Sequence, residues 1–308
     1  RAFGRFGFEV SEVALGTWGL SGDPYGPIRA DMRDKVIERA VEHDINLFET
    51  ADVYGQGEME TLLGEMLDPA STYVVTKIGV CRSAEPPQKR FDRDSLRAAF
   101  DGSQERLGRD KLDVVLLHCP SVTVLEAGDC ATTMRELIEE GRLSHWGVSA
   151  GSPEVAGAAV DAGAEVVELA YNLMLASDLH EVADSIAATE TALLARSVLA
   201  HGLLAGYWRP DRTFPSSDHR NKRWDPEQLR YRVEQLSAVR PLLGEEVPSL
   251  RALALRFVLA NHLVSSAVLG PRTLLQLDQL VRELADSPLS ESILQELPLR
   301  LASVGLQP

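Results

Sequence analysis

The chain has 308 residues, of which 44% are hydrophobic and 25% are charged, and its formal net charge is −15. This composition is typical of a globular protein with a large buried core. The acidic balance argues against general binding to nucleic acids or to anionic membranes. No apolar segment reaches the length that spans a bilayer. We therefore expect neither a nucleic-acid partner nor a membrane partner.

The three cysteines, Cys81, Cys119 and Cys130, are few and scattered. Their spacing relative to histidine matches no zinc site, and an odd number of cysteines suits a reducing compartment. The first ten residues lack the apolar core of a signal peptide. These features predict a soluble, cytoplasmic protein without a metal site.

The N-terminal segment resembles a β-hairpin, and alternating strand and helix patterns follow it in chain order. Residues 1–12 have Gly4 or Gly7 near the expected turn. Short apolar runs rich in β-branched residues then begin at Val13, Ile45, Thr72, Leu112, Leu143, Val166, Thr191 and Leu263. Such near-continuous runs are typical of parallel strands that are buried on both faces.

Helical patterns lie between these runs, over Ala30–His43, Asp94–Leu107, Asp129–Glu140, Ser152–Ala162 and Ser177–Ala188. Asp94 is a candidate N-cap, and Ser152 followed by Pro153 is a favourable helix start. Eight strands with helices between them, and no linker rich in Pro or Gly, predict a single (β/α)₈ TIM barrel. We expect the N-terminal hairpin to close its bottom. The alternative is a doubly wound sheet, whose Gly-x-Gly-x-x-Gly fingerprint is missing after the first strand.

Four polar residues follow the expected strands where the strands end. Asp52 and Tyr54 follow the second strand, Lys77 ends the third, and His118 ends the fourth. In such barrels the carboxyl ends of the strands carry the chemistry. Each residue alone has a structural explanation, such as capping, packing or solvation. The combination is harder to explain that way, because Lys77 and His118 end strongly apolar strands, where a polar group needs a partner.

Together these four residues are suited to proton transfer. A free phenol has a pKa of about 10, and a nearby ammonium stabilises the phenolate and lowers that pKa. We expect Asp52 to hold Lys77 in its charged form, and His118 to orient a carbonyl. The sequence therefore predicts that Tyr54 is a general acid for a developing alkoxide.

The sequence resembles the aldo-keto reductase superfamily over nearly its whole length. The matching segments are LGTWG at 15–19, ETADVYGQGEMETLLG at 49–64, VVTK at 74–77, LLHCP at 116–120, WGVSA at 146–150, RSVLAHGLLAG at 196–206 and LGPR at 269–272. The resemblance implies one barrel domain over residues 1–308 and a catalytic tetrad of Asp52, Tyr54, Lys77 and His118. It also implies an NADPH-dependent oxidoreductase that reduces an aldehyde or ketone to an alcohol.

The resemblance implies that NADPH binds across the strand ends without a Rossmann domain. The implied residues are Gly16, Thr17 and Trp18 near the nicotinamide, Ser149 and Glu168 at the carboxamide, Arg196 against the nicotinamide ring, Ser197, Leu199, Gly202 and Leu203 at the pyrophosphate, and Gly270, Arg272, Gln276 and Gln279 around the adenosine and its 2′-phosphate. Arg272 suits a phosphate because its donors form a fork, although it could instead be a surface arginine of a helix.

Several positions depart from the family pattern. Ala150 and Leu280 replace asparagine, Glu168 replaces glutamine, and Arg196 replaces an aromatic residue. We hypothesise that Glu168 and Arg196 form an ion pair, because they lie on neighbouring strands beside the same ring. The substitutions also keep open a cofactor-binding sensor or regulatory subunit with slow turnover. A lyase or isomerase barrel without nicotinamide is the remaining alternative.

Two loops are candidates for substrate recognition, at 21–28 and at 206–224. The second has a local excess of positive charge, which is typical of an anion site. We favour a loop that is solvated or covers the phosphates of the cofactor. The alternative is recognition of a phosphorylated or nucleotide-linked sugar. We expect a small-molecule carbonyl substrate, with an anionic or sugar-linked one as the sharper hypothesis, and a monomer or small homo-oligomer.

Overall fold

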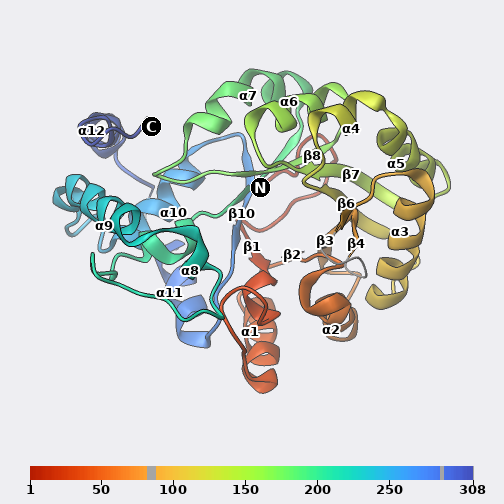
Figure 1. Cartoon of the computed structure of the whole chain (residues 1–308), viewed down its shortest axis with the longest axis horizontal. Helices are drawn as coiled ribbons and strands as arrows, with labels where there is room; N and C mark the ends of the chain where they lie inside the picture. The colour runs from red at the N-terminus through yellow and green to blue at the C-terminus, as the bar shows by residue number, and fades with distance from the viewer. Residues whose placement is uncertain (82–87, 285–287, 308) are drawn as a thin grey trace.

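The structure is a computed structural model that describes residues 1–81, 88–284 and 288–307. Eight parallel strands close into a barrel in the order β1-β10-β9-β8-β7-β6-β3-β2, with helices around it (Figure 1). The barrel strands are β1 (Val13–Gly16), β2 (Leu47–Glu49), β3 (Tyr73–Ile78), β6 (Leu112–His118), β7 (Leu143–Ser149), β8 (Val166–Ala170), β9 (Ala192–Arg196) and β10 (Val264–Leu269). The (β/α)₈ barrel is therefore confirmed, and the doubly wound sheet is excluded. The strands β4 (Val80–Cys81) and β5 (Gln88–Lys89) form a separate antiparallel pair.

Twelve α-helices lie within the described ranges. They are α1 (Ala30–Glu42), α2 (Glu58–Met66), α3 (Arg93–Leu107), α4 (Val122–Ala127), α5 (Asp129–Glu139), α6 (Pro153–Asp161), α7 (Ser177–Thr189), α8 (Arg220–Arg223), α9 (Pro226–Gln235), α10 (Leu250–Ala260), α11 (Leu274–Leu284) and α12 (Glu291–Ala302). All five expected helical segments are present. Within those same ranges, every helix is too short or too polar to pass through a bilayer.

The N-cap predicted from the sequence is confirmed for α6 and wrong for α3. The Ser152 side chain accepts a hydrogen bond from the Val155 amide, as expected for the N-cap of α6. Asp94 is not the cap of α3, because the helix begins earlier. Asp92 is the cap, and its carboxylate accepts a hydrogen bond from the Ser95 amide at 3.0 Å.

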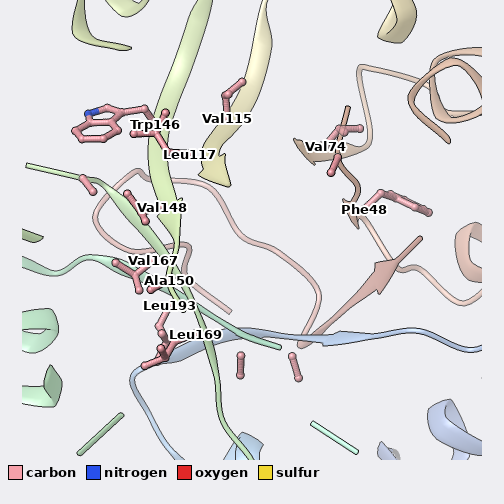
Figure 2. Packing of buried hydrophobic residues seen from close by; sticks show 14 of the residues in the cluster. Phe48, Val74, Val115, Leu117, Trp146, Val148, Ala150, Val167, Leu169 and Leu193 are labelled. Carbon is pink, nitrogen blue, oxygen red and sulfur yellow. The ribbon is translucent and has the colours of Figure 1, made fainter. Parts of the chain in front are cut away.

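The strands are buried on both faces, which explains their near-continuous apolar sequences. One face contributes residues such as Phe48, Val115 and Val167 to a core shared with the surrounding helices (Figure 2). The other face forms a smaller core inside the barrel, which includes Val75 and Leu194. A further apolar cluster joins η3 (Ala200–Ala205) to α9, α10 and α12.

The N-terminal hairpin closes the bottom of the barrel, as expected. Ala2 and Glu9 form an antiparallel bridge, and Phe3 is fully buried in the inner core. Gly4 has a φ of 55°, and a Cβ there would lie 2.8 Å from the Glu190 carbonyl oxygen. Only glycine therefore fits this turn without strain. The hairpin covers the amino ends of the strands. A site can therefore form at the opposite, carboxyl ends.

Candidate functional site

Charged side chains converge at the carboxyl ends of the strands because of strand geometry. Successive side chains point to opposite faces of a strand, so residues two positions apart share a face. The inner core contains Leu47, Val75, Leu116, Val166 and Leu194. The residues two positions later are Glu49, Lys77, His118, Glu168 and Arg196. Five strands therefore direct a polar or charged side chain toward the same end of the barrel interior.

Lys77 lies at the centre of this group and is only 2% exposed. Its ammonium donates hydrogen bonds to the Thr50 carbonyl at 3.1 Å and to the Tyr54 hydroxyl at 3.4 Å. It also forms ion pairs with the Glu49 carboxylate and, at 3.6 Å, with Glu168 Oε2. Burial lowers the pKa of Lys77, and the negative charge of Glu168 opposes that shift.

The carboxylate that pairs with Lys77 differs from the expected one. Glu49, the last residue of β2, faces the barrel axis and contacts the ammonium. Asp52 follows the end of the strand, and its backbone amide donates a hydrogen bond to the Lys77 carbonyl at 3.0 Å. The expected side-chain pair between Asp52 and Lys77 is thus corrected to a pair between Glu49 and Lys77. Glu49 could have been identified from the sequence, because it lies two residues after the inward-facing Leu47.

Tyr54 begins the short helical turn η2 (Tyr54–Gly57), and its hydroxyl lies beside both members of this ion pair. The hydroxyl donates to Glu49 Oε1 at 3.5 Å and accepts from Lys77. The His118 ring lies edge-on to the phenol ring, with centroids 6.4 Å apart. The structure therefore brings Tyr54, Lys77 and His118 together, as expected.

The pKa of Tyr54 shifts opposite to the expected direction. Burial raises it above the usual value, and the negative charge of Glu168 raises it further. The expected lowering depends on an ammonium held by one carboxylate, whereas in the structure the ammonium is shared by two carboxylates and the phenol is buried. The phenol consequently stays protonated at neutral pH, which is the form that can donate a proton.

The expected ion pair between Glu168 and Arg196 does not form. Glu168 pairs in register with Leu194, whereas Arg196 pairs with Ala170, so the two side chains lie at different heights along the barrel. Arg196 instead donates hydrogen bonds to the Ala150 carbonyl at 2.9 Å and to Ser197 Oγ at 3.4 Å. Glu168 is directed toward Lys77.

The remaining residues that the sequence assigned to a cofactor lie along one arc of the rim. With β8, which carries Glu168, their strands form one continuous run of the barrel. The residues are Ser149 at the end of β7, Ser197, Leu199, Gly202 and Leu203 after β9, Gly270, Arg272, Gln276 and Gln279 after β10, and Gly16, Thr17 and Trp18 at β1. Thr17 Oγ1 and Glu168 Oε2 are buried, and no described residue forms a hydrogen bond with either atom. Buried polar atoms without partners are costly, so a ligand with hydrogen-bonding groups fits this arc.

The 21–28 loop contacts both Arg272 and the 206–224 loop. The Arg272 guanidinium donates to the carbonyls of Tyr25, Gly26 and Pro27, at 3.1, 2.7 and 3.1 Å. Tyr25 also forms an isolated bridge with Asp218 of the 206–224 loop. Arg272 is therefore not a free surface arginine of a helix, because it anchors the 21–28 loop.

Part of the positive charge of the 206–224 loop is neutralised by an acidic residue of the same loop. Arg220 forms a bidentate ion pair with Asp218 and lies over the Tyr25 ring, 4.7 Å from its centroid. The nearby His201 is largely buried, and burial together with neighbouring arginines lowers its pKa to about 3. His201 is therefore neutral at physiological pH, and the neighbouring arginines supply the positive charge of this region.

Gly16 has to be glycine because Glu49 fills the space beside it. A Cβ at Gly16 would lie 2.9 Å from Glu49 Oε2 and 2.8 Å from a methyl group of Val268. We expect Gly16→Ala to displace Glu49 from Lys77 and to lower the free energy of unfolding by about 1–3 kcal/mol, the usual effect of overpacking. Urea unfolding measures this change. Gly244→Ala is the control, because a Cβ there meets no atom within 4 Å; equal stability of both variants would contradict the expectation.

Comparisons with known proteins identify the family of this chain. The sequence model of the Aldo/keto reductase family matches residues 12–297. Aldo-keto reductase YhdN of Bacillus subtilis is 27% identical over 242 residues, which cover 77% of this chain and 72% of the relative. Pyridoxal 4-dehydrogenase of Microbacterium luteolum is 26% identical over an alignment that covers 91% of each chain.

Solved structures show the same fold. The glycerol dehydrogenase AKR11B4 from Gluconobacter oxydans superposes with a TM-score of 0.83 at 25% identity, covering 97% of this chain and 94% of the other. The holo form of the aldo-keto reductase AKR11C1 from Bacillus halodurans has a TM-score of 0.83 at 21% identity, covering 99% and 97%. The barrel, the charged group at its carboxyl end and these matches establish that the chain belongs to the aldo/keto reductase family of oxidoreductases, which act on carbonyls or alcohols with nicotinamide cofactors.

Proposed function

We propose that this protein is an NADPH-dependent carbonyl reductase that uses Tyr54 as its general acid. The observation that carries the proposal is the buried contact between the Tyr54 hydroxyl and the Lys77 ammonium, at 3.4 Å. Glu49 pairs with the same ammonium and also accepts the hydrogen bond of the Tyr54 hydroxyl at 3.5 Å. A neutral phenol, an ammonium and its counter-ion form a proton donor, in which the ammonium offsets part of the cost that burial and Glu168 impose on the phenolate.

In the proposed reaction, an aldehyde or ketone, NADPH and a proton give an alcohol and NADP⁺. NADPH, when bound, supplies the hydride to the carbonyl carbon. Tyr54 donates its proton to the carbonyl oxygen as negative charge develops there, and Lys77 stabilises the phenolate that remains. We assign His118 to orient the carbonyl oxygen, and we keep Asp52 as a member of the group because its charge acts on Tyr54.

Binding and turnover test this proposal separately. We expect NADPH fluorescence to change on titration with the protein, and NADPH to be consumed with at least one member of a carbonyl panel. The panel includes glyceraldehyde and pyridoxal, because two relatives are named glycerol dehydrogenase and pyridoxal 4-dehydrogenase. It also includes phosphorylated and nucleotide-linked sugars, to test the arginines of the 206–224 loop. Absence of NADPH binding would overturn the proposal of an NADPH-dependent reductase.

The second candidate is a cofactor-binding sensor with slow turnover. It is favoured by Ala150, Glu168 and Arg196, which change the side chains around the expected nicotinamide position. Single-turnover oxidation of bound NADPH by a reactive aldehyde separates the two functions. Fast oxidation supports the reductase, and slow oxidation at saturating aldehyde supports the sensor.

Arg272 is proposed to read the 2′-phosphate of NADPH. We expect Arg272→Ala to weaken NADPH much more than NADH, since only NADPH has this group. A hydrogen bond to a charged group contributes roughly 1.5–3 kcal/mol, or about ten-fold to more than a hundred-fold in affinity. Titrations with both cofactors measure the effect, with the exposed Arg29→Ala as control. Equal losses for both cofactors would indicate that Arg272 acts only by anchoring the 21–28 loop.

A further inference from the structure

Glu168 is a buried carboxylate whose charge is not fully compensated by its surroundings. Its side chain is 1% exposed, at the middle of β8. Lys77 is its ion-pair partner among the residues that the structure describes, and Lys77 is shared with Glu49. Two carboxylates therefore face one ammonium in a dry environment, where Coulomb interactions are strong.

The contact between Glu168 and Lys77 is an ion pair without a hydrogen bond. An ammonium has three N–H donors. Those of Lys77 are directed to Glu49, to the Thr50 carbonyl and to the Tyr54 hydroxyl. No donor remains for Glu168, and Oε2 of Glu168 has no hydrogen-bond partner in the described part of the chain. A buried carboxylate oxygen without a hydrogen bond is stabilised by a ligand that supplies a hydrogen-bond donor and a positive charge.

Arg196 does not cancel this charge. It is half-buried, and its guanidinium is engaged by the Ala150 carbonyl and by Ser197 rather than by Glu168. Because water screens a half-exposed cation more than a buried anion, the field of Glu168 dominates close to Tyr54. The same field is one of the causes that raise the pKa of Tyr54.

We propose that Glu168 is a positioning residue that makes the site bind the oxidised nicotinamide more tightly than the reduced one. This inference rests on the proposed function, because the carbon that exchanges a hydride must lie beside the carbonyl that Tyr54 protonates. Glu168 contacts Lys77, and Lys77 contacts the Tyr54 hydroxyl, so the carboxylate lies within two contacts of that position. The oxidised ring carries a positive charge that the reduced ring lacks, and its carboxamide offers N–H donors to Oε2.

Tighter binding of the oxidised form changes the redox equilibrium of the bound cofactor. If the oxidised form binds more tightly than the reduced form, the equilibrium on the protein shifts toward the oxidised form by the same factor. Bound NADPH is then a stronger hydride donor than free NADPH. Glu168 consequently favours carbonyl reduction over alcohol oxidation, and it also slows release of NADP⁺.

The test is direct measurement of dissociation constants for NADP⁺ and NADPH by calorimetry and fluorescence, without substrate. In Glu168→Gln, which keeps the shape and the carbonyl acceptor, we expect the Kd of NADP⁺ to rise about ten-fold. We expect the Kd of NADPH to change less than two-fold. Arg196→Gln removes a charge of the opposite sign and is expected to shift the ratio of the two constants in the opposite direction, by a smaller factor.

The wild-type protein provides a second measurement that needs no variant. 2′-Phospho-ADP-ribose lacks the nicotinamide ring, so comparison with it isolates the contribution of the ring to affinity. We expect the ring to contribute more in NADP⁺ than in NADPH. An unchanged ratio in Glu168→Gln, or an equal ring contribution in both forms, would overturn the role of Glu168 and leave the reductase proposal intact. Failure of the wild-type protein to bind either dinucleotide would overturn both.

Discussion

Replacement of Tyr54 by phenylalanine is expected to abolish most carbonyl reduction while leaving NADPH binding close to that of the wild type. The hydroxyl donates to Glu49 at 3.5 Å and contacts the Lys77 ammonium, so its removal deletes the proposed acid and leaves the ring in place. General acid catalysis typically contributes about 10² to 10⁴ in rate. Steady-state kinetics with the best substrate of the carbonyl panel measure the loss.

Tyr73→Phe is the matched control for this prediction. Tyr73 begins β3 at the opposite end of the barrel, where its ring stacks on Phe8 with centroids 4.5 Å apart. The same deletion of a hydroxyl there should leave turnover unchanged. Turnover of Tyr54→Phe at the wild-type rate would remove Tyr54 from the mechanism.

Replacement of Lys77 by methionine is expected to damage both stability and activity. The variant leaves Glu49 and Glu168 buried, at 5% and 1% side-chain exposure, without their shared cation. Breaking a buried pair by removing one partner usually costs about 3–5 kcal/mol. The variant also loses the charge that stabilises the Tyr54 phenolate, so turnover should fall at least as far as in Tyr54→Phe. Urea unfolding and steady-state kinetics measure the two effects.

A second substitution and a surface control test whether the loss of stability comes from the carboxylates left without their cation or from any loss of a lysine. Adding Glu49→Gln to Lys77→Met removes one stranded charge and should recover part of the stability but none of the activity. Lys35→Met removes an exposed partner of Asp31 in α1, and surface pairs contribute only about 0–1 kcal/mol. If Lys77→Met and Lys35→Met unfold at the same urea concentration, the buried ion pairs do not contribute as described.

The order and type of the barrel elements could be predicted from the sequence because they depend on local patterns. All eight strand segments and the five expected helices are found where the apolar runs and the helical spacing place them. The helices that were not anticipated lie mostly in the last third of the chain, such as α9 and α12, where apolar residues pack a separate cluster. The sequences of α9 and α12 are rich in Leu and charged residues, but no strand directly follows either helix to indicate a β/α unit.

The site residues were predicted best where the side chain lies on a strand. Lys77 and His118 end strands, and their convergence with Tyr54 follows from the closed barrel. The prediction of Asp52 rests on its place after the second strand, two residues before Tyr54, and does not consider Glu49. Proximity in sequence is a weaker guide than the alternation of side chains along a strand, which turns Glu49 inward.

The sequence by itself determined the family, the barrel and the end of the barrel at which the candidate site lies, because these depend on motifs and on periodicity along the chain. Only the tertiary structure decided which charges meet. The register between β8 and β9 separates Glu168 from Arg196, and closure of the barrel brings Glu168 to Lys77 instead. The direction of the Tyr54 pKa shift follows from those contacts and from burial. The contacts of Glu168 and the pKa shift of Tyr54 depend on distances between strands that are far apart in the sequence, and no local pattern encodes those distances.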